Sequence, residues 1–301
     1  MAHFDHDEIS RRAGPDACGE QFVQTVRNGG YDVVLYQTAG RDHMPPEAIR
    51  QAGRLSPVIA WNSDDDWQWE GYTSRLAPYF TFMVTTYPHI FEANRADVPN
   101  LRLSQWGCYD LLADFAHPKD LPFSFVGRVY GARYADCRLL RRKAGLRVFG
   151  SGSRLLTLGI PPFRGCSRIP GLMGAPLLDY GEVNAVWNRT RVSYTPLGSS
   201  ADPRLLQIKG RVFQMGLSGT LMLCDNHPGV ERYYDPGKEY VMFHDLDECA
   251  DKARYYLAHE TERARIARAY HDRTRAEHTW QHRFTRLFED VGLHPAPGAN
   301  R

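Results

Sequence analysis

Lys209-Gly-Arg211-Val-Phe213-Gln214 opens the stretch of sequence that decides the fold. The stretch continues through Ser218-Gly219-Thr-Leu-Met-Leu-Cys-Asp225, Pro228-Gly229-Val-Glu231, Gly237-Lys-Glu239 and His278-Thr279-Trp280-Gln-His-Arg283. A basic pair begins a helical pattern, a glycine leads into a buried strand, and a Pro-Gly turn precedes a carboxylate. Positive charge at a helix start beside a parallel sheet suits a negatively charged nucleotide. The stretch therefore predicts an α/β domain with a phosphate-binding edge.

Composition sets the outer bounds. The 301 residues suggest about two domains, and 43% hydrophobic with 24% charged residues is ordinary globular usage. A formal charge of +2 argues against a protein that coats nucleic acid. No apolar run is long enough to span a membrane, and the sequence from Met1 to Glu8 does not resemble a signal peptide. Six scattered cysteines without a C-x-x-C pair predict reduced, buried thiols in a cytoplasmic protein without a structural zinc site.

The first part of the chain alternates buried strands with short helices. Such continuous apolar strands predict a parallel sheet that is covered on both faces. The expected strands are residues 31–36, 57–62, 80–85 and 101–103, and the expected helices are 46–52 and 88–95. A polar, proline-bearing connection follows at 114–122. We place the boundary there, with an N-terminal Rossmann-like domain over residues 1–118.

A second alternating set predicts another Rossmann-like domain over residues 119–275, and segment 151–179 is expected to be a long loop. A helix over 276–292 and a disordered tail over 293–301 complete the expected organisation. The strands of this set are expected at residues 123–127, 146–150, 191–195, 220–224 and 240–243, and its helices at 131–144, 180–188, 205–217, 246–258 and 260–276.

Basic residues and turns of the second domain predict the ligand site. Gly127 ends a strand, and the turn carries Arg128 and leads to Arg133, so its backbone N–H groups are expected to approach an anion. Lys209 and Arg211 are expected to hold a diphosphate. Each of these also fits a solvated turn without a function.

Polar residues that follow are expected to hold the rest of the nucleotide and its sugar. The Gln214 amide is placed within reach of a ribose hydroxyl, and Asp225 at the same sheet edge. Glu231 is expected to accept hydrogen bonds from sugar hydroxyls. Asp225 also suits a plain turn, and Glu231 suits the first turn of a helix without any ligand.

Three residues of the first domain are candidate catalytic groups. Asp64 and Asp65 follow a buried strand in an Asp-Asp-Asp run, and His89 begins a helix after another strand. Carboxylates in this position suit an acceptor ligand or a general base. A divalent metal is the less favoured interpretation, because the basic residues of the second domain already supply positive charge. An exposed acidic turn and a structural histidine are the alternatives.

Motifs along residues 31–290 resemble the spore-maturation (CgeB-type) glycosyltransferase-like family. They are Trp61-Asn-Ser-Asp64-Asp65, Leu76-Ala-Pro-Tyr-Phe80, Thr85-Thr86, Phe125-Val-Gly127 with Arg133, Lys209-x-Arg211-x-Phe213, Gly219, Glu231, Gly237-x-Glu239 and His278-Thr279 with Arg283. The resemblance implies a GT-B architecture of two Rossmann-like domains, with the donor in the C-terminal one and the acceptor in the N-terminal one. It also implies metal-independent transfer with retention of configuration, and a final helix that crosses back to the first domain.

The sequence departs from that family pattern in two places. Gln214 stands where the family has a glutamate that holds the donor ribose, and Leu206 stands where the wider superfamily has a partner glutamate. An amide binds a hydroxyl without the added strength of a charge. Residues 1–30 show no strand with a glycine loop, so the first domain is expected to be small or truncated.

The leading hypothesis is therefore a glycosyltransferase that uses a nucleotide-diphosphate sugar and needs no cofactor. A nucleotide-sugar-binding scaffold that has lost turnover is the first alternative, and a nucleotide-sugar epimerase is the second. Nucleic acid is not an expected partner, because no aromatic-basic recognition motif appears. The base, the sugar, the acceptor and the oligomeric state are left open by the sequence.

Overall fold

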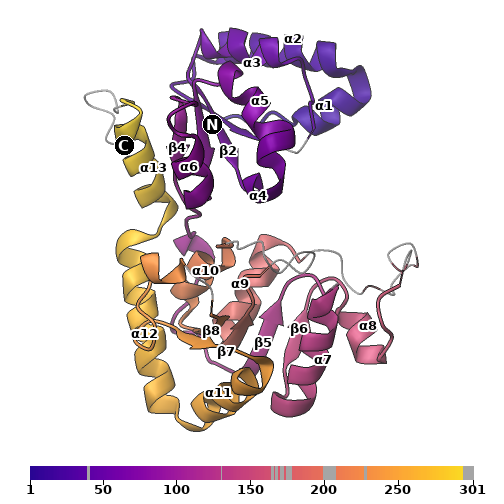
Figure 1. Cartoon of the computed structure of the whole chain (residues 1–301), viewed down its shortest axis with the longest axis vertical. Helices are drawn as coiled ribbons and strands as arrows, with labels where there is room; N and C mark the ends of the chain where they lie inside the picture. Colours follow the sequence, from indigo (N-terminus) through magenta and orange to yellow (C-terminus); the bar gives the residue numbers. More distant parts are fainter. Residues whose placement is uncertain are drawn as a thin grey trace. The chain divides into compact units, whose positions relative to one another are not determined.

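The computed structural model describes the chain except residues 39–40, 130, 164–165, 167–168, 170–172, 174–177, 199–207, 227–228 and 294–301. The chain divides into two compact units. The first contains Met1–Gln105 together with Thr285–Arg301, and the second contains Trp106–Phe284. The division falls after Gln105, whereas the sequence placed its boundary after residue 118. Figure 1 labels the helices and strands of both units.

The first unit is built on a parallel four-stranded sheet. Its order is β1 (Val34–Gln37), β2 (Val58–Asn62), β3 (Phe82–Thr85) and β4 (Leu101–Leu103). Every residue of β2 is buried, as expected for a strand that is covered on both faces. The helices are α1 (His6–Ala13), α2 (Pro15–Gly29), α3 (Pro46–Gly53), α4 (Asp65–Gln68), α5 (Ser74–Leu76) and α6 (Pro88–Asn94), with a π-helix at Trp69–Thr73.

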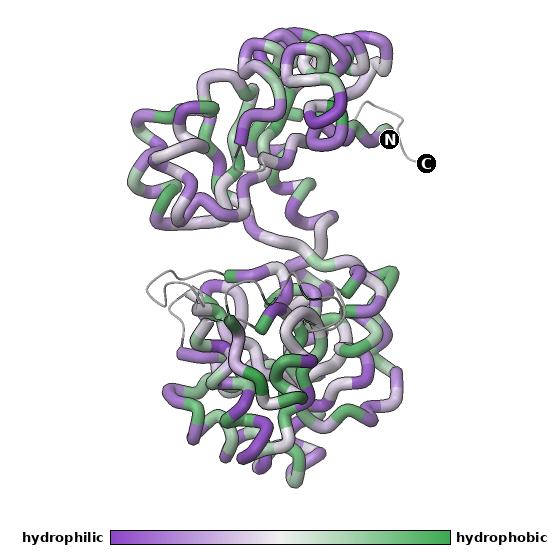
Figure 2. The backbone as a smooth tube through the Cα atoms, turned by 90° about the vertical axis from the view of Figure 1, so that its right-hand side faces the viewer, coloured by the Kyte–Doolittle hydropathy of each residue, from purple (hydrophilic) through white to green (hydrophobic). Residues whose placement is uncertain are grey.

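The N-terminal thirty residues form helices rather than a strand. Pro15 at the start of α2 and Gly30 in a left-handed conformation at its end fix that helix. Phe22 and Val23 are neighbours on α2, Val26 lies one turn further on, and all three enter the core of the first unit. Figure 2 shows hydrophilic and hydrophobic residues interspersed along the backbone of both units.

The second unit is built on a parallel five-stranded sheet in the order β6 (Arg147–Phe149), β5 (Leu121–Val126), β7 (Thr190–Thr195), β8 (Leu221–Asp225) and β9 (Val241–Phe243). Its helices are α7 (Ala132–Ala144), α8 (Ser153–Leu158), α9 (Tyr180–Arg189), α10 (Arg211–Gln214), α11 (Leu246–Ala258) and α12 (Glu260–Glu277). The last helix, α13 (Trp280–Asp290), begins in the second unit, and its residues from Thr285 onward belong to the first. Both sheets confirm the predicted α/β class.

Alternation along β8 separates two cores in the second unit. Leu221 and Leu223 pack in the cluster that contains residues of α7 and α11, whereas Met222 and Cys224 pack with residues of α9 and α10. The strand is therefore apolar from Leu221 to Cys224, because successive side chains point to opposite faces and each face is covered. All six cysteines are buried and none forms a disulfide.

Two expected elements differ in extent. The segment 151–179 contains α8, where the sequence predicted only a loop, because Leu155 and Leu156 are drawn into the core. The helix expected over 205–217 is the short α10, followed by a 3-10 turn at Met215–Ser218. Residues 205–207, Pro228 and the predicted tail from residue 294 lie outside the described residues. No helix in the described ranges has the length and hydropathy to cross a membrane.

Candidate functional site

Two arginines of the second unit converge on one aromatic ring at the end of β5. The guanidinium carbons of Arg133 and Arg211 lie 5.7 and 5.6 Å from the centre of the Phe125 ring. Arg211 also donates from Nη1 to the Val126 carbonyl at 3.2 Å. A Cβ added to Gly127 would lie 3.4 Å from both Nη atoms of Arg211, and the φ of Gly127 is +151°. Gly127 therefore lets the guanidinium approach the strand end closely.

A third cation joins the same sheet edge after β7. The carbonyl of Gly198 accepts a hydrogen bond from Arg133 at 3.1 Å and another from Lys209 Nζ at 3.4 Å. Asp225, at the end of β8, accepts the backbone N–H groups of Leu197 and Gly198. Asp225 thereby fixes the turn to which the cations bind. The structure thus brings together Gly127, Arg133, Lys209, Arg211 and Asp225.

Two backbone N–H groups of the Gly127 turn form hydrogen bonds within the protein. The N–H of Gly127 donates to the Phe149 carbonyl at 2.9 Å, and the N–H of Val129 donates to the Ser151 carbonyl at 2.8 Å. These hydrogen bonds extend the pairing of β5 with the β6 side of the sheet. These two N–H groups are therefore paired within the protein, and the positive charge at this edge belongs to the side chains of Arg133, Lys209 and Arg211. The four-residue α10 is likewise too short to add a strong dipole.

Arg128 and Glu231 lie at the exposed margin of the second unit. Both residues are exposed. The Glu231 carboxylate accepts the N–H of Gly229 at 3.1 Å, at the start of the 3-10 turn Val230–Arg232. That contact is the local one that a carboxylate in a first turn makes without a ligand.

Gln214 is held by the protein itself. Its Oε1 accepts the N–H of Tyr109 at 2.8 Å and the hydroxyl of Tyr180 at 3.1 Å. Its Nε2 donates to the Tyr109 carbonyl at 2.9 Å and to Asn184 Oδ1 at 2.8 Å. The side chain is 2% exposed, and all its polar capacity on both atoms is directed at these partners. Only an amide supplies both donors and acceptors here, so the structure accounts for Gln in place of Glu.

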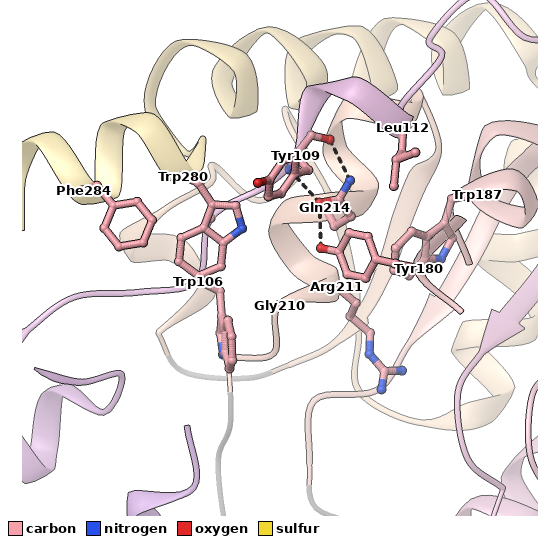
Figure 3. A pocket seen from close by; sticks show the side chains of 11 residues that line it. Trp106, Tyr109, Leu112, Tyr180, Trp187, Gly210, Arg211, Gln214, Trp280 and Phe284 are labelled. Atoms are coloured by element: carbon pink, nitrogen blue, oxygen red, sulfur yellow. Dashed lines mark hydrogen bonds between the residues drawn. The ribbon is translucent and has the colours of Figure 1, made fainter. Parts of the chain in front are cut away.

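An aromatic cavity of about 730 Å³ adjoins Gln214 and lies entirely within the second unit. Figure 3 shows Trp106, Trp280 and Phe284 on one side of it and Tyr180 with Trp187 on the other. Arg211 lines the cavity and also belongs to the cation cluster. Arg211 is therefore common to the cavity and the charged sheet edge. Its size is that of pockets that hold drug-sized ligands.

The family model described as "Glycosyl transferase-like" matches residues 137–289, just over half of the chain. That range contains Lys209, Arg211 and Gln214. The chain belongs to this glycosyltransferase-like family. No curated protein matches it significantly in sequence.

Solved structures share the fold of this glycosyltransferase-like chain at low identity. A glycosyltransferase from Rickettsia africae has a TM-score of 0.61 at 10% identity, over 91% of this chain and 79% of that one. Anabaena Alr3699/HepE, solved with UDP and glucose, has a TM-score of 0.61 at 11% identity, over 96% and 84%. Sucrose-phosphate synthase from Thermosynechococcus elongatus has 0.56 at 12%, over 97% and 81%. These likenesses establish the GT-B fold, and nothing in them is specific to the spore-maturation type.

The three candidate catalytic residues of the glycosyltransferase-like chain lie at the ends of β2 and β3 in the first unit. Asp64 and His89 are exposed, whereas Asp65 is 1% exposed. Burial raises the pKa of Asp65 to about 6, although the nearby Thr85 and Thr73 hydroxyls lower it. Burial and the neighbouring Asp66 raise the pKa of Asp64. Of the two aspartates, only Asp64 is exposed to a ligand in this conformation.

The two chain connections that bound the second unit are joined to each other. The N–H of Cys108 donates to the His278 carbonyl at 3.0 Å, and the N–H of Trp280 donates to the Cys108 carbonyl at 3.2 Å. Arg283 Nε donates to the Trp106 carbonyl at 3.0 Å. We call residues 106–108 with 278–283 the clamp. Since Trp106 and Trp280 also line the cavity, the clamp forms one of its walls.

Sequence reasoning did not find the cavity. Its aromatic residues come from segments that are far apart in the sequence, and no periodic pattern links them. One signal was present: Trp280 stands in the His278-Thr279-Trp280 motif. The pairing of Cys108 with Thr279 brings that motif to the Trp106 connection.

Proposed function

We propose that this chain transfers a sugar from a nucleotide-diphosphate sugar to an acceptor, without a metal and with retention of configuration. The observation that carries the proposal is the convergence of Arg133, Lys209 and Arg211 at the carboxyl edge of β5 and β7. Ligands of open α/β sheets bind outside the carboxyl ends of the strands. The solved HepE neighbour contains UDP and glucose, a nucleotide and sugar of this class.

The cations have a defined part in such a reaction. When the bond between the anomeric carbon and the diphosphate breaks, negative charge develops on the leaving oxygens. Fixed cations stabilise that charge without reorganisation, and they take the place of a divalent ion. Arg133 and Arg211 are held over the Phe125 ring, so their positions are set before the ligand arrives. Retention is the outcome that the family resemblance implies.

Calorimetry with UDP tests the diphosphate assignment. The double variant Lys209→Ala with Arg211→Ala is expected to bind UDP at least about tenfold more weakly, because two charge-assisted contacts are lost. The matched control is Arg138→Ala with Arg142→Ala, which removes two exposed charges further along α7. Equal affinity of the double variant and the wild type would contradict the role of Lys209 and Arg211.

A binding protein without turnover is the second candidate, and Gln214 favours it. The amide is fully committed to Tyr109, Tyr180 and Asn184, so in this conformation it is not presented to a ribose. Donor sugars incubated with a panel of acceptors separate the two candidates. Release of nucleoside diphosphate that depends on an acceptor supports the transferase. Isomerised donor without an acceptor would instead indicate an epimerase.

A further inference from the structure

Several buried oxygen atoms gather beside Asp65 in the first unit. Neither carboxylate oxygen of Asp65 has a hydrogen-bond partner, and the side chain is 1% exposed. The hydroxyls of Thr73 and Thr85 lie beside this carboxyl. Both threonines are fully buried, and Thr73 Oγ1 also has no hydrogen-bond partner. The group therefore has unused oxygen atoms around one formal negative charge.

A buried carboxylate needs a neutralising partner. An isolated charge in the protein interior costs several kcal/mol unless it is paired or takes up a proton. Among the described residues, no Lys, Arg or His forms an ion pair with Asp65. The adjacent Asp64 and Asp66 add negative charge instead. The Thr73 and Thr85 hydroxyls favour the charged form of Asp65 only in part, because neither carries a formal positive charge.

The backbone over this group is unusual. Between Asp65 and Leu76 the chain passes through α4, the π-helix Trp69–Thr73 and α5 without a break. The π-helix ends at Thr73, the residue whose hydroxyl lies beside the Asp65 carboxyl. Single π-turns of this kind are frequent at functional sites. Thr85 is the last residue of β3, and its Oγ1 accepts the N–H of Tyr87 at 3.3 Å.

The available atoms select the kind of ligand. Carboxylate and hydroxyl oxygens are ligands for hard cations. In the described residues there is no group of three or more His, Cys, Asp or Glu that could hold a metal ion, so several carboxylates are not gathered here to balance a divalent charge. One buried carboxylate balances one positive charge. We propose that Asp65, Thr73 and Thr85 bind a monovalent cation, Na⁺ or K⁺, which fastens the segment Asp65–Leu76 to the ends of β2 and β3.

The bound ion is a structural element of the first unit, and the inference does not depend on the proposed transfer reaction. Thermal unfolding of the full chain tests it at slightly alkaline pH. The probes are NaCl, KCl and choline chloride at equal ionic strength, since choline is too large to enter a buried site. A cation at about ten times its dissociation constant raises the unfolding midpoint by roughly 3–6 °C over choline.

Two variants locate the effect. Asp65→Asn is expected to abolish the rise in midpoint, whereas the matched control Asp64→Asn, at the exposed neighbour, keeps it. Thr73→Val preserves the shape of the side chain and removes one oxygen, so it is expected to reduce the rise in the unfolding midpoint. This variant replaces Asp65→Asn in the test if Asp65→Asn does not fold. Equal midpoints of the wild type in all three salts would overturn the inference. A rise with MgCl₂ or CaCl₂ alone, or a full rise in both Asp65→Asn and Thr73→Val, would overturn it as well.

Discussion

Acidification is expected to destabilise the second unit through His278. The ring is 3% exposed, its Nδ1 lies 3.0 Å from Nη2 of Arg283, and its Nε2 lies 3.1 Å from the Tyr233 carbonyl. Arg283 donates to Nδ1 and Nε2 donates to Tyr233 in the neutral form. A second ring proton would be buried and would face a guanidinium. Burial, together with Arg283, lowers the pKa of His278 to about 4, although its hydrogen bond to Tyr233 opposes the shift.

The sign and size follow from linkage. The folded-state pKa of about 4 lies below the ordinary value of 6.5, so the unfolded chain binds the proton more tightly. The contribution to stability is complete above pH 6.5 and is lost as the pH falls towards 4. A difference of about 2.5 pKa units corresponds to about 3 kcal/mol. The loss is therefore a large fraction of the stability of an ordinary domain.

Urea unfolding at a series of pH values measures this loss as a difference between proteins. His278→Gln keeps a donor towards Tyr233 but does not titrate, and subtracting its curve cancels the other ionisable groups. The wild type is expected to lose about 3 kcal/mol more than the variant over that range. The protection factor of the Cys108 amide hydrogen, which is bound to the His278 carbonyl, is expected to fall in parallel once the intrinsic exchange rate at each pH is divided out. Stability curves that stay parallel down to pH 4 would refute the reasoning.

Two substitutions test the packing of the same unit. Gln214→Glu places a carboxylate where two donors are required, so it is expected to lower the free energy of unfolding by about 3 kcal/mol. The control Gln281→Glu, at an exposed position, is expected to change it little. Denaturant unfolding measures both, and equal effects would contradict the hydrogen-bond network around Gln214. Gly107→Ala would put a Cβ 2.7 Å from the backbone N and Cα of Trp280 and is expected to cost about 1–3 kcal/mol. Gly71→Ala meets nothing within 4 Å and is the control, with an expected change within about 0.5 kcal/mol. A thermal midpoint for Gly107→Ala that equals that of Gly71→Ala would contradict the close approach.

The strands were predictable because their signal is local. The run from Val58 to Trp61 is apolar and the whole strand to Asn62 is buried, so the sequence alone predicts a covered parallel strand. Start and stop residues also act locally: Asp179 and Glu182 form the capping box that begins α9. The proximity of Arg211 to Gly127 was also predictable from the sequence, since both residues are expected at the carboxyl edge of the same sheet.

The rest depends on contacts between distant residues. The sequence cannot show that Gln214 pairs with the backbone of Tyr109, over a separation of 105 residues, rather than with a ligand. It cannot show that Asp65 is buried while Asp64 is exposed, because successive residues at a helix start differ only in the direction of the side chain. The sequence also does not show that the N–H of Gly127 forms a hydrogen bond with the Phe149 carbonyl.

The assignment of the C-terminal segment to the first unit has a consequence for synthesis on the ribosome. The second unit is one continuous stretch, Trp106–Phe284, so all of it emerges before the first unit is complete. The first unit lacks its share of α13 until the residues after Phe284 have been translated, and with it the ion pair between Arg102 and Asp290 at 2.9 Å. The second unit can therefore finish folding before the first unit's share of α13 has been synthesised. A chain that stalls at this stage would contain a folded second unit and an incompletely folded first unit.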